Sequence, residues 1–129
     1  MLNDPLANIL NKILNAHRVG KSECIASPVS KTILKVLTIM QAHKYLGEVE
    51  LLNKKILPKA KINLIGSINK CAAVKPRFSV KKGNYEKFEK RYLPAKDIGL
   101  LIVSTSKGIM THHEAKKKNM GGVLLAYVY

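Results

Sequence analysis

Two runs of apolar residues near the carboxyl terminus constrain the fold of this 129-residue chain most strongly. The first run occupies residues 98–103 (IGLLIV), and the second occupies residues 123–129 (VLLAYVY). Short apolar runs of this kind predict buried β-strands. The residues between the two runs are polar, so we expect their side chains to be free for contacts with a partner.

The polar connection begins with STSKGIM at residues 104–110 and continues with a helix-start pattern, Thr111 followed three residues later by Glu114. In such a capping box each side chain satisfies the other residue's backbone amide, which predicts a short helix that begins at Thr111. Lysines 116–118 then fall in its last turns, where they favour the helix dipole. The pair Gly121–Gly122 is expected to end this helix.

Hydrophobic periodicity in the first half predicts the order helix, strand, helix, strand, strand. Asp4 followed by Pro5 is a typical helix start, and Gly20 a typical stop. The expected elements are a helix over residues 4–20, a strand over 22–26, a helix from Ser30 to near Gly47, and a hairpin of strands over 49–51 and 61–65.

The character of the sequence changes after Gly66, and Pro76 marks a second break. We therefore expect an amino-terminal α/β lobe at residues 1–66 and a carboxyl-terminal, mainly β lobe with a short helix at residues 67–129. In the second lobe we also expect a strand from Phe78 and a helix that Asn84 caps and Pro94 closes. The predicted fold class is α+β, with two small lobes.

Positive charge is the unusual feature of the composition. The chain has 23 Lys and Arg residues against 8 Asp and Glu residues, a net charge of +15, and they are spread along its whole length. A folded body with this much self-repulsion usually works against a polyanion, either nucleic acid or an anionic membrane, although a merely soluble basic protein is an alternative. The lysines are not gathered on one amphipathic helix, which argues against the membrane. Without a signal pattern or a long apolar run, we expect a soluble intracellular protein.

Catalytic, metal and cofactor sites find little support in the sequence. Cys24 and Cys71 lie in apolar surroundings, which indicates small core residues. His112 and His113 are adjacent, so on a helix they diverge by about 100° and do not form a joint metal site. The lysine of STSKG follows the hydroxyls, the reverse of a phosphate-binding P-loop. We therefore expect no catalytic residue, no metal and no cofactor.

The STSKG segment allows two interpretations. Its hydroxyls can donate and accept hydrogen bonds, and Gly108 lets the backbone approach a ligand, a combination that suits RNA. The alternative is a turn whose hydroxyls cap the local backbone. Similarly, Tyr85, Phe88 and Tyr92 could stack on bases, but their helical spacing favours core packing. The residues alone leave the choice for STSKG open.

A longer motif supports the RNA reading. STSKGIMTHHEAKKKNMGG at residues 104–122 resembles the signature of the universal ribosomal protein eight of the small subunit. Three further segments, DPLANIL near the start, LTIMQAHKYLGEVE at residues 37–50 and NKCAAVKPRF at residues 69–78, resemble its archaeal and eukaryotic cytosolic branch, as does YEKFEKRYLP. His113 departs from the family pattern, which usually has glutamate there.

The resemblance implies a structural protein, not an enzyme, that binds the central domain of small-subunit rRNA early in assembly. It implies contacts mainly through the carboxyl-terminal lobe and a contact of the amino-terminal lobe with a second rRNA helix. The residues expected to bind RNA in the carboxyl-terminal lobe are Ser104, Thr105, Ser106, Lys107, Gly108, Lys116, Lys117, Gly121 and Gly122. In the amino-terminal lobe they are Asp4, Pro5, Ser30 and Lys31.

The family also implies partners and a location. The expected neighbours are the small-subunit ribosomal proteins five, twelve and seventeen, and the expected location is the cytoplasmic small subunit. Two alternatives stay open: a free-standing RNA-binding translational regulator, and a small RNA-processing enzyme that uses Ser or His.

Overall fold

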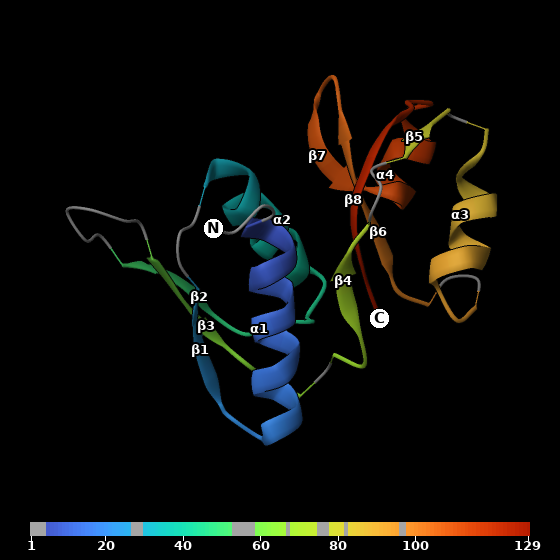
Figure 1. Cartoon of the computed structure of the whole chain (residues 1–129). Coiled ribbons are helices and arrows are strands. Elements are labelled where there is room, and N and C mark those ends of the chain that lie inside the picture. Colours follow the sequence, from blue (N-terminus) through green and yellow to red (C-terminus); the bar gives the residue numbers. More distant parts are fainter. Residues whose placement is uncertain are drawn as a thin grey trace. The chain divides into compact units, whose positions relative to one another are not determined.

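The computed structural model describes residues 5–26, 30–52, 59–66, 68–74, 78–81, 83–95 and 98–129. The chain divides into two compact units, Met1–Lys70 and Cys71–Tyr129 (Figure 1). Both contain helices and antiparallel sheet, which confirms the predicted α+β class in two lobes. The domain boundary between residues 66 and 67 stays a prediction.

The first unit has the predicted order of elements. These are α1 (Pro5–Val19), β1 (Glu23–Ala26), α2 (Lys31–Ala42), β2 (Val49–Leu52) and β3 (Lys59–Asn63). The strands form an antiparallel sheet with the order β1-β3-β2. The expected pairing of β2 with β3 is present, and β1 pairs with the other edge of β3.

Alternation along the strands decides which face of this sheet is covered. Cys24, Ala60 and Ile62 are buried, whereas their neighbours in sequence are exposed or half-buried. The helices supply the rest of the core from one stripe each, as the three-and-four spacing of their apolar residues predicts. The buried helix residues are Leu6, Ile9, Leu10, Ile13 and Leu14 of α1 and Ile33, Val36, Leu37 and Met40 of α2.

The second unit is built on a five-stranded antiparallel sheet. Its elements are β4 (Cys71–Ala73), β5 (Ser79–Val80), α3 (Tyr85–Tyr92), β6 (Leu100–Thr105), β7 (Gly108–Thr111), α4 (His112–Lys117) and β8 (Gly122–Val128). The order is β4-β8-β6-β7, and β5 also pairs with β8. The two apolar runs of the sequence are therefore β6 and β8, which lie side by side at the centre. The strands β4 and β7 were not expected.

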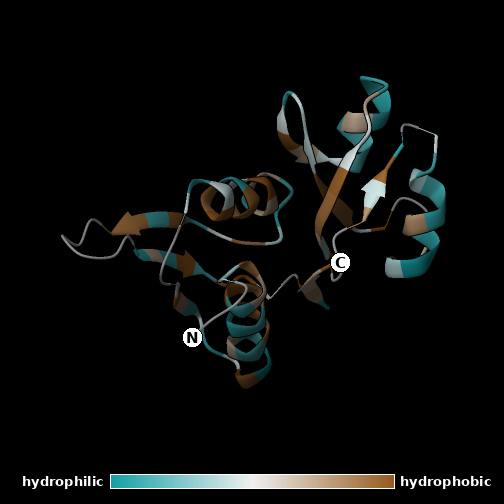
Figure 2. Ribbon diagram, turned by 45° about the horizontal axis from the view of Figure 1, so that its top comes forward, coloured by the Kyte–Doolittle hydropathy of each residue, from teal (hydrophilic) through white to brown (hydrophobic). Residues whose placement is uncertain are grey.

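The core of the second unit lies between the sheet and its two helices. Leu101 and Val103 of β6 and Leu124 of β8 belong to one buried cluster with Tyr85 and Phe88 of α3. The ribbons of β6 and β8 are accordingly among the more hydrophobic in Figure 2. Tyr85 and Phe88 are buried core residues, which confirms the packing interpretation for them, and Tyr92 is half-buried against the same cluster.

Three helices end in the same way, and two of them end earlier than expected. After α1, α2 and α4 a residue with positive φ turns the chain: Gly20 (85°), Lys44 (66°) and Asn119 (53°). In each case the next amide donates to the carbonyl five residues back, as from Lys21 N to Ala16 O. Gly20 is the predicted stop. The predictions of Gly47 and Gly121–Gly122 were wrong, because Lys44 and Asn119 adopt the left-handed conformation themselves.

Gly99, just before β6, is a position where we expect substitution to be costly. Its φ is 86°, and a Cβ would lie 2.7 Å from Val128 O and 2.8 Å from Tyr129 Cβ. Gly99→Ala should therefore lower the free energy of unfolding by at least about 2 kcal/mol. Gly83→Ala is the matched control, because the described residues leave that site open. Urea unfolding followed by circular dichroism measures both, and an equal effect of the two changes would contradict the expectation.

Candidate nucleic-acid interface

The STSKGIM segment is a β-hairpin and not the loop expected after a strand. Ser104 and Thr105 are the last residues of β6, and β7 begins at Gly108. Thr105 pairs with Gly108, which leaves Ser106 and Lys107 as a two-residue turn. Both turn residues are exposed, and Gly108 has a φ of 117° that favours glycine. The hairpin rises from one end of the sheet in Figure 1.

The three hydroxyls of this hairpin have different surroundings. Thr105 Oγ1 donates to Gly108 O (2.8 Å) and accepts from Lys107 N (3.2 Å), so this hydroxyl holds the turn. Within the described residues, the hydroxyls of Ser104 and Ser106 make no hydrogen bond. Ser104 is half-buried and Ser106 exposed. The turn-forming alternative therefore describes Thr105, whereas Ser104 and Ser106 keep their hydrogen-bonding capacity.

Gly122 lies against the base of this hairpin. Ser104 pairs with Val123, and a Cβ on Gly122 would collide with the Ser104 carbonyl and lie 2.7 Å from Val103 Cγ1. Glycine is thus required here by the close approach of β8 to β6. This packing brings the segment that contains Gly121 and Gly122 to the end of β6 that carries Ser104.

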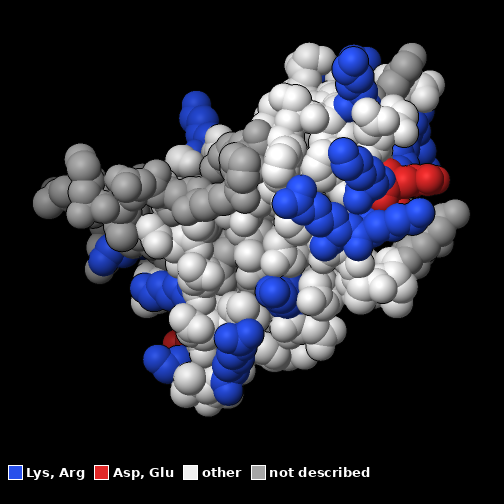
Figure 3. Space-filling view, turned by 45° about the vertical axis from the view of Figure 1, so that its right-hand side comes forward, with Lys and Arg blue, Asp and Glu red and all other residues white. Residues whose placement is uncertain are grey.

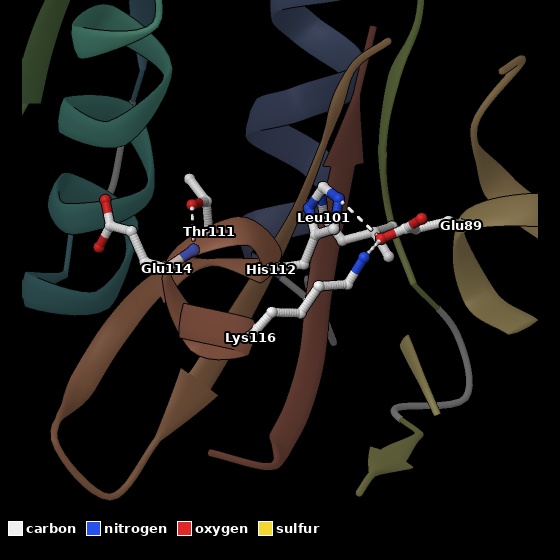
Figure 4. A network of polar contacts seen from close by, with 6 residues as sticks. All are labelled: Glu89, Leu101, Thr111, His112, Glu114 and Lys116. Atoms are coloured by element: carbon white, nitrogen blue, oxygen red, sulfur yellow. Dashed lines mark hydrogen bonds and ion pairs between the residues drawn. The ribbon is translucent and has the colours of Figure 1, made fainter. Parts of the chain in front are cut away.

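Helix α4 begins where predicted. Thr111 Oγ1 accepts a hydrogen bond from Glu114 N (3.3 Å), the first half of the predicted capping box (Figure 4). Ala115 is fully buried and fixes the inner side of the helix. Lys117 is exposed, but the ammonium of Lys116 contacts Glu89 Oε1 of α3. The two lysines of α4 that are expected to bind RNA therefore differ in how much of their charge is free.

Behind α4 lies a polar network around His112, whose side chain is 1% exposed. Its Nδ1 accepts from Leu101 N (3.0 Å), and its Nε2 lies 3.2 Å from Glu89 Oε1 (Figure 4). Because Nδ1 is an acceptor, the ring hydrogen is on Nε2 and is donated to Glu89. Glu89 is 9% exposed and accepts from both His112 and Lys116, so its buried carboxylate is satisfied.

Burial keeps His112 neutral. Desolvation, followed by the neighbouring His113, lowers the pKa of His112 to about 4, and the Glu89 carboxylate only partly opposes this. The rings of His112 and His113 are in contact, with centroids 3.9 Å apart, so the expected divergence of the two side chains was wrong. His112 uses both ring nitrogens in the network and has none left for a metal ion.

The second group of predicted residues lies in the first unit. Ser30 is the N-cap of α2, and its Oγ accepts from Ile33 N (3.3 Å). Lys31 is exposed in the first turn of α2, and Pro5 is exposed at the start of α1. Asp4 lies outside the described residues. These residues belong to the first unit, whereas the hairpin group belongs to the second.

Other candidate chemistry is absent from the described parts of the chain. Cys24 and Cys71 are both buried, as expected of small core residues. No group of three or more possible metal ligands occurs among the residues that the structure covers. The helices of the same residues are all too short or too polar to cross a lipid bilayer.

The surface of the second unit is rich in positive charge. Figure 3 shows several groups of Lys and Arg side chains on one face of the molecule, with an acidic patch beside one of these groups. Among the described residues of the second unit, the exposed basic ones are Lys81, Lys87, Lys90, Arg91, Lys107, Lys117 and Lys118. An anionic partner would therefore be attracted to this unit as a whole, and the hairpin adds specific hydrogen-bonding groups.

The sequence analysis did not predict the contact between Glu89 and His112 behind α4. One signal was available for Glu89. It lies on the buried stripe of α3, four residues after Tyr85 and next to Phe88, and a carboxylate on a buried stripe needs a partner. Nothing in the sequence indicated that His112 would be that partner.

His112 should make the stability of the protein pH-dependent. Above pH 6.5 the imidazole is neutral in both the folded and the unfolded state. As the pH falls from 6.5 toward 4, the unfolded state takes up a proton and the folded state does not, so the free energy of unfolding decreases. The total loss is at most about 3 kcal/mol. The loss should shrink more in His112→Asn than in His113→Asn, which removes only the second cause of the lowered pKa. Urea unfolding at pH 4.5 and pH 7 measures both, and an unchanged loss in His112→Asn would contradict the assignment.

A comparison with protein families agrees with this geometry. The model of the family described as ribosomal protein S8 matches residues 4–129, which is nearly the whole chain. The family consists of structural proteins of the small ribosomal subunit that bind rRNA, and it is not a family of enzymes. The matched region contains the hairpin, α4 and the glycine pair. The chain therefore belongs to the ribosomal protein S8 family.

Proposed function

We propose that this protein binds the central domain of small-subunit rRNA through the β6–β7 hairpin and the segment of Gly121–Gly122, and that it helps this domain to assemble. The observation that carries the proposal is the arrangement at the end of β6. The hydroxyls of Ser104 and Ser106 are unused within the described chain, and Gly122 packs against the Ser104 backbone beside them.

This arrangement suits irregular RNA for a physical reason. Hydroxyl groups can both donate to and accept from base edges and 2′-hydroxyls, so they can recognise a particular RNA shape. Lys107 and Lys117 are exposed and can neutralise phosphates without reading sequence. Lys116 contributes less free charge because Glu89 partly neutralises it. Specificity is thus expected from the serines and general affinity from the lysines.

A second rRNA contact is proposed for the first unit. Lys31 and Pro5 are exposed at helix starts, and Ser30 supports the first turn of α2. With Asp4 they form the set that the family resemblance indicates. The neighbours proposed by the same resemblance are small-subunit proteins five, twelve and seventeen, in a cytoplasmic ribosome. The segments LTIMQAHKYLGEVE and YEKFEKRYLP support placement in the archaeal and eukaryotic branch.

The alternative function is a free-standing regulator that binds RNA away from the ribosome. Sedimentation of a tagged chain separates the two functions. A structural protein should stay with small subunits washed in high salt, because a large specific interface resists counterion competition. Recovery of the chain only in the soluble fraction would contradict the ribosomal assignment.

Substitutions in the hairpin and in α4 should have different effects on RNA binding. Ser106→Ala should weaken binding to an irregular central-domain hairpin by about 1–3 kcal/mol, because a specific hydrogen bond is lost, and should leave a mismatched hairpin unaffected. Lys117→Ala should weaken binding to both RNAs similarly, and it should reduce the slope of log affinity against log salt concentration by about one. Mobility-shift titrations at several salt concentrations measure these effects.

Thr105→Ser is a control for the hairpin change, because it keeps the hydroxyl that holds the turn. If Ser106→Ala reduced the affinities for the specific and the mismatched hairpin equally, the division between serines and lysines would be wrong.

A further inference from the structure

Helix α3 is bonded at two points to the segment that runs from α4 to β8. Glu89 accepts from Lys116 and His112 at the start and middle of this segment. One turn earlier on α3, the Tyr85 hydroxyl donates to Met120 O (2.8 Å). The second bond reaches the chain just before Gly121 and Gly122.

The Met120 residue is held from both sides. Its amide donates to Ala115 O (2.9 Å), which closes the end of α4. Its carbonyl accepts from Tyr85. Between the helix and Met120 the chain passes through Asn119 with a φ of 53°, a conformation that needs support from its surroundings. The two hydrogen bonds together determine the direction in which the chain leaves α4.

That direction decides where the glycine pair meets the hairpin. Gly121 and Gly122 follow Met120 directly, and Gly122 packs against the Ser104 backbone with no room for a Cβ. A small rotation at Met120 would therefore change the contact between Gly122 and the end of β6. The chain of contacts runs from Tyr85 through Met120 and Gly122 to Ser104.

We propose that Tyr85 is a positioning residue for RNA binding, whose hydroxyl holds residues 120–122 in the path that presents the glycine pair and Ser104 to RNA. The inference rests on the proposed function, since it assigns α3 a role in that same site. Under this proposal α3 has a task besides covering the sheet: it supports the RNA-contacting segment from behind.

The ring and the hydroxyl of Tyr85 have separable roles. The ring is 1% exposed and belongs to the core cluster with Phe88, Leu101 and Leu124. The hydroxyl reaches beyond this cluster to a backbone carbonyl, and burial raises its pKa, so it stays a hydrogen-bond donor. Removing only the oxygen therefore leaves the core packing in place and releases Met120 O.

The test is Tyr85→Phe in the full-length protein, with Tyr92→Phe as the matched control on the same helix. The Tyr92 ring stacks on Tyr127 at 5.2 Å, and its hydroxyl makes no hydrogen bond within the described residues. Tyr85→Phe should weaken binding to the irregular central-domain hairpin roughly three- to tenfold, the loss expected for one hydrogen bond. Binding to the mismatched hairpin and the salt dependence should not change, because no phosphate contact is removed.

Hydrogen exchange gives a second readout that does not depend on RNA. The amides of Gly121 and Gly122 should exchange faster in Tyr85→Phe than in the wild type, while those of β6 at Leu101 and Val103 keep their rates. Tyr92→Phe should leave both groups unchanged. Unchanged exchange at the glycine pair in Tyr85→Phe would overturn the positioning role.

The binding experiment also separates this inference from the proposed function. If the wild type prefers the irregular hairpin and Tyr85→Phe keeps that preference, the positioning role is overturned and the function stands. If both tyrosine variants lose affinity equally, the effect belongs to α3 in general and the positioning role is again overturned. If the wild type shows no preference at all, the proposed function fails first.

Discussion

The hydrogen bond from Leu101 N to His112 Nδ1 is the interaction on which the second unit depends. Strand β6 is central and its residues 100–103 are buried, so every backbone amide along it needs a partner. Strand β7 pairs with it only as far as Thr111, opposite Ile102. At the next position the chain turns into α4, and the His112 ring takes over the acceptor role that a strand carbonyl would have had. The strand can therefore end and the helix begin without an unsatisfied buried amide.

The His112 side chain links three elements. The Nε2–H of the same imidazole donates a hydrogen bond to Glu89 Oε1, so α4 and β6 are bonded to α3. Lys116 also contacts Glu89, and its positive charge offsets the carboxylate on the buried side of α3. The cost is acid sensitivity, since a protonated ring could not accept from Leu101. In return, α3, α4 and β6 are bonded to one another next to the strand that leads into the hairpin.

The sequence indicated the elements better than their connections. Both apolar runs were recognised as strands because burial makes them continuous, and α4 was recognised because its capping residues, Thr111 and Glu114, are local. Strand β7 was missed because GIMT is four residues long and has no hydrophobic period of its own. It is a strand only because the Ser106–Lys107 turn brings it back along β6. The ends of α2 and α4 were misplaced because Lys44 and Asn119 adopt a conformation that sequence rules reserve mainly for glycine.

The sequence by itself determined the fold class, the excess of positive charge, the two central strands of the second unit and the start of α4. These follow from periodicity, composition and motif, which are local properties of the chain. Only the tertiary structure decided which hydroxyls stay free, which lysine is neutralised, and what holds the surface in place. Those outcomes depend on pairs far apart in sequence, such as Tyr85 with Met120 and Glu89 with His112, and hydrogen bonds of this kind exist only after the core has brought the partners together.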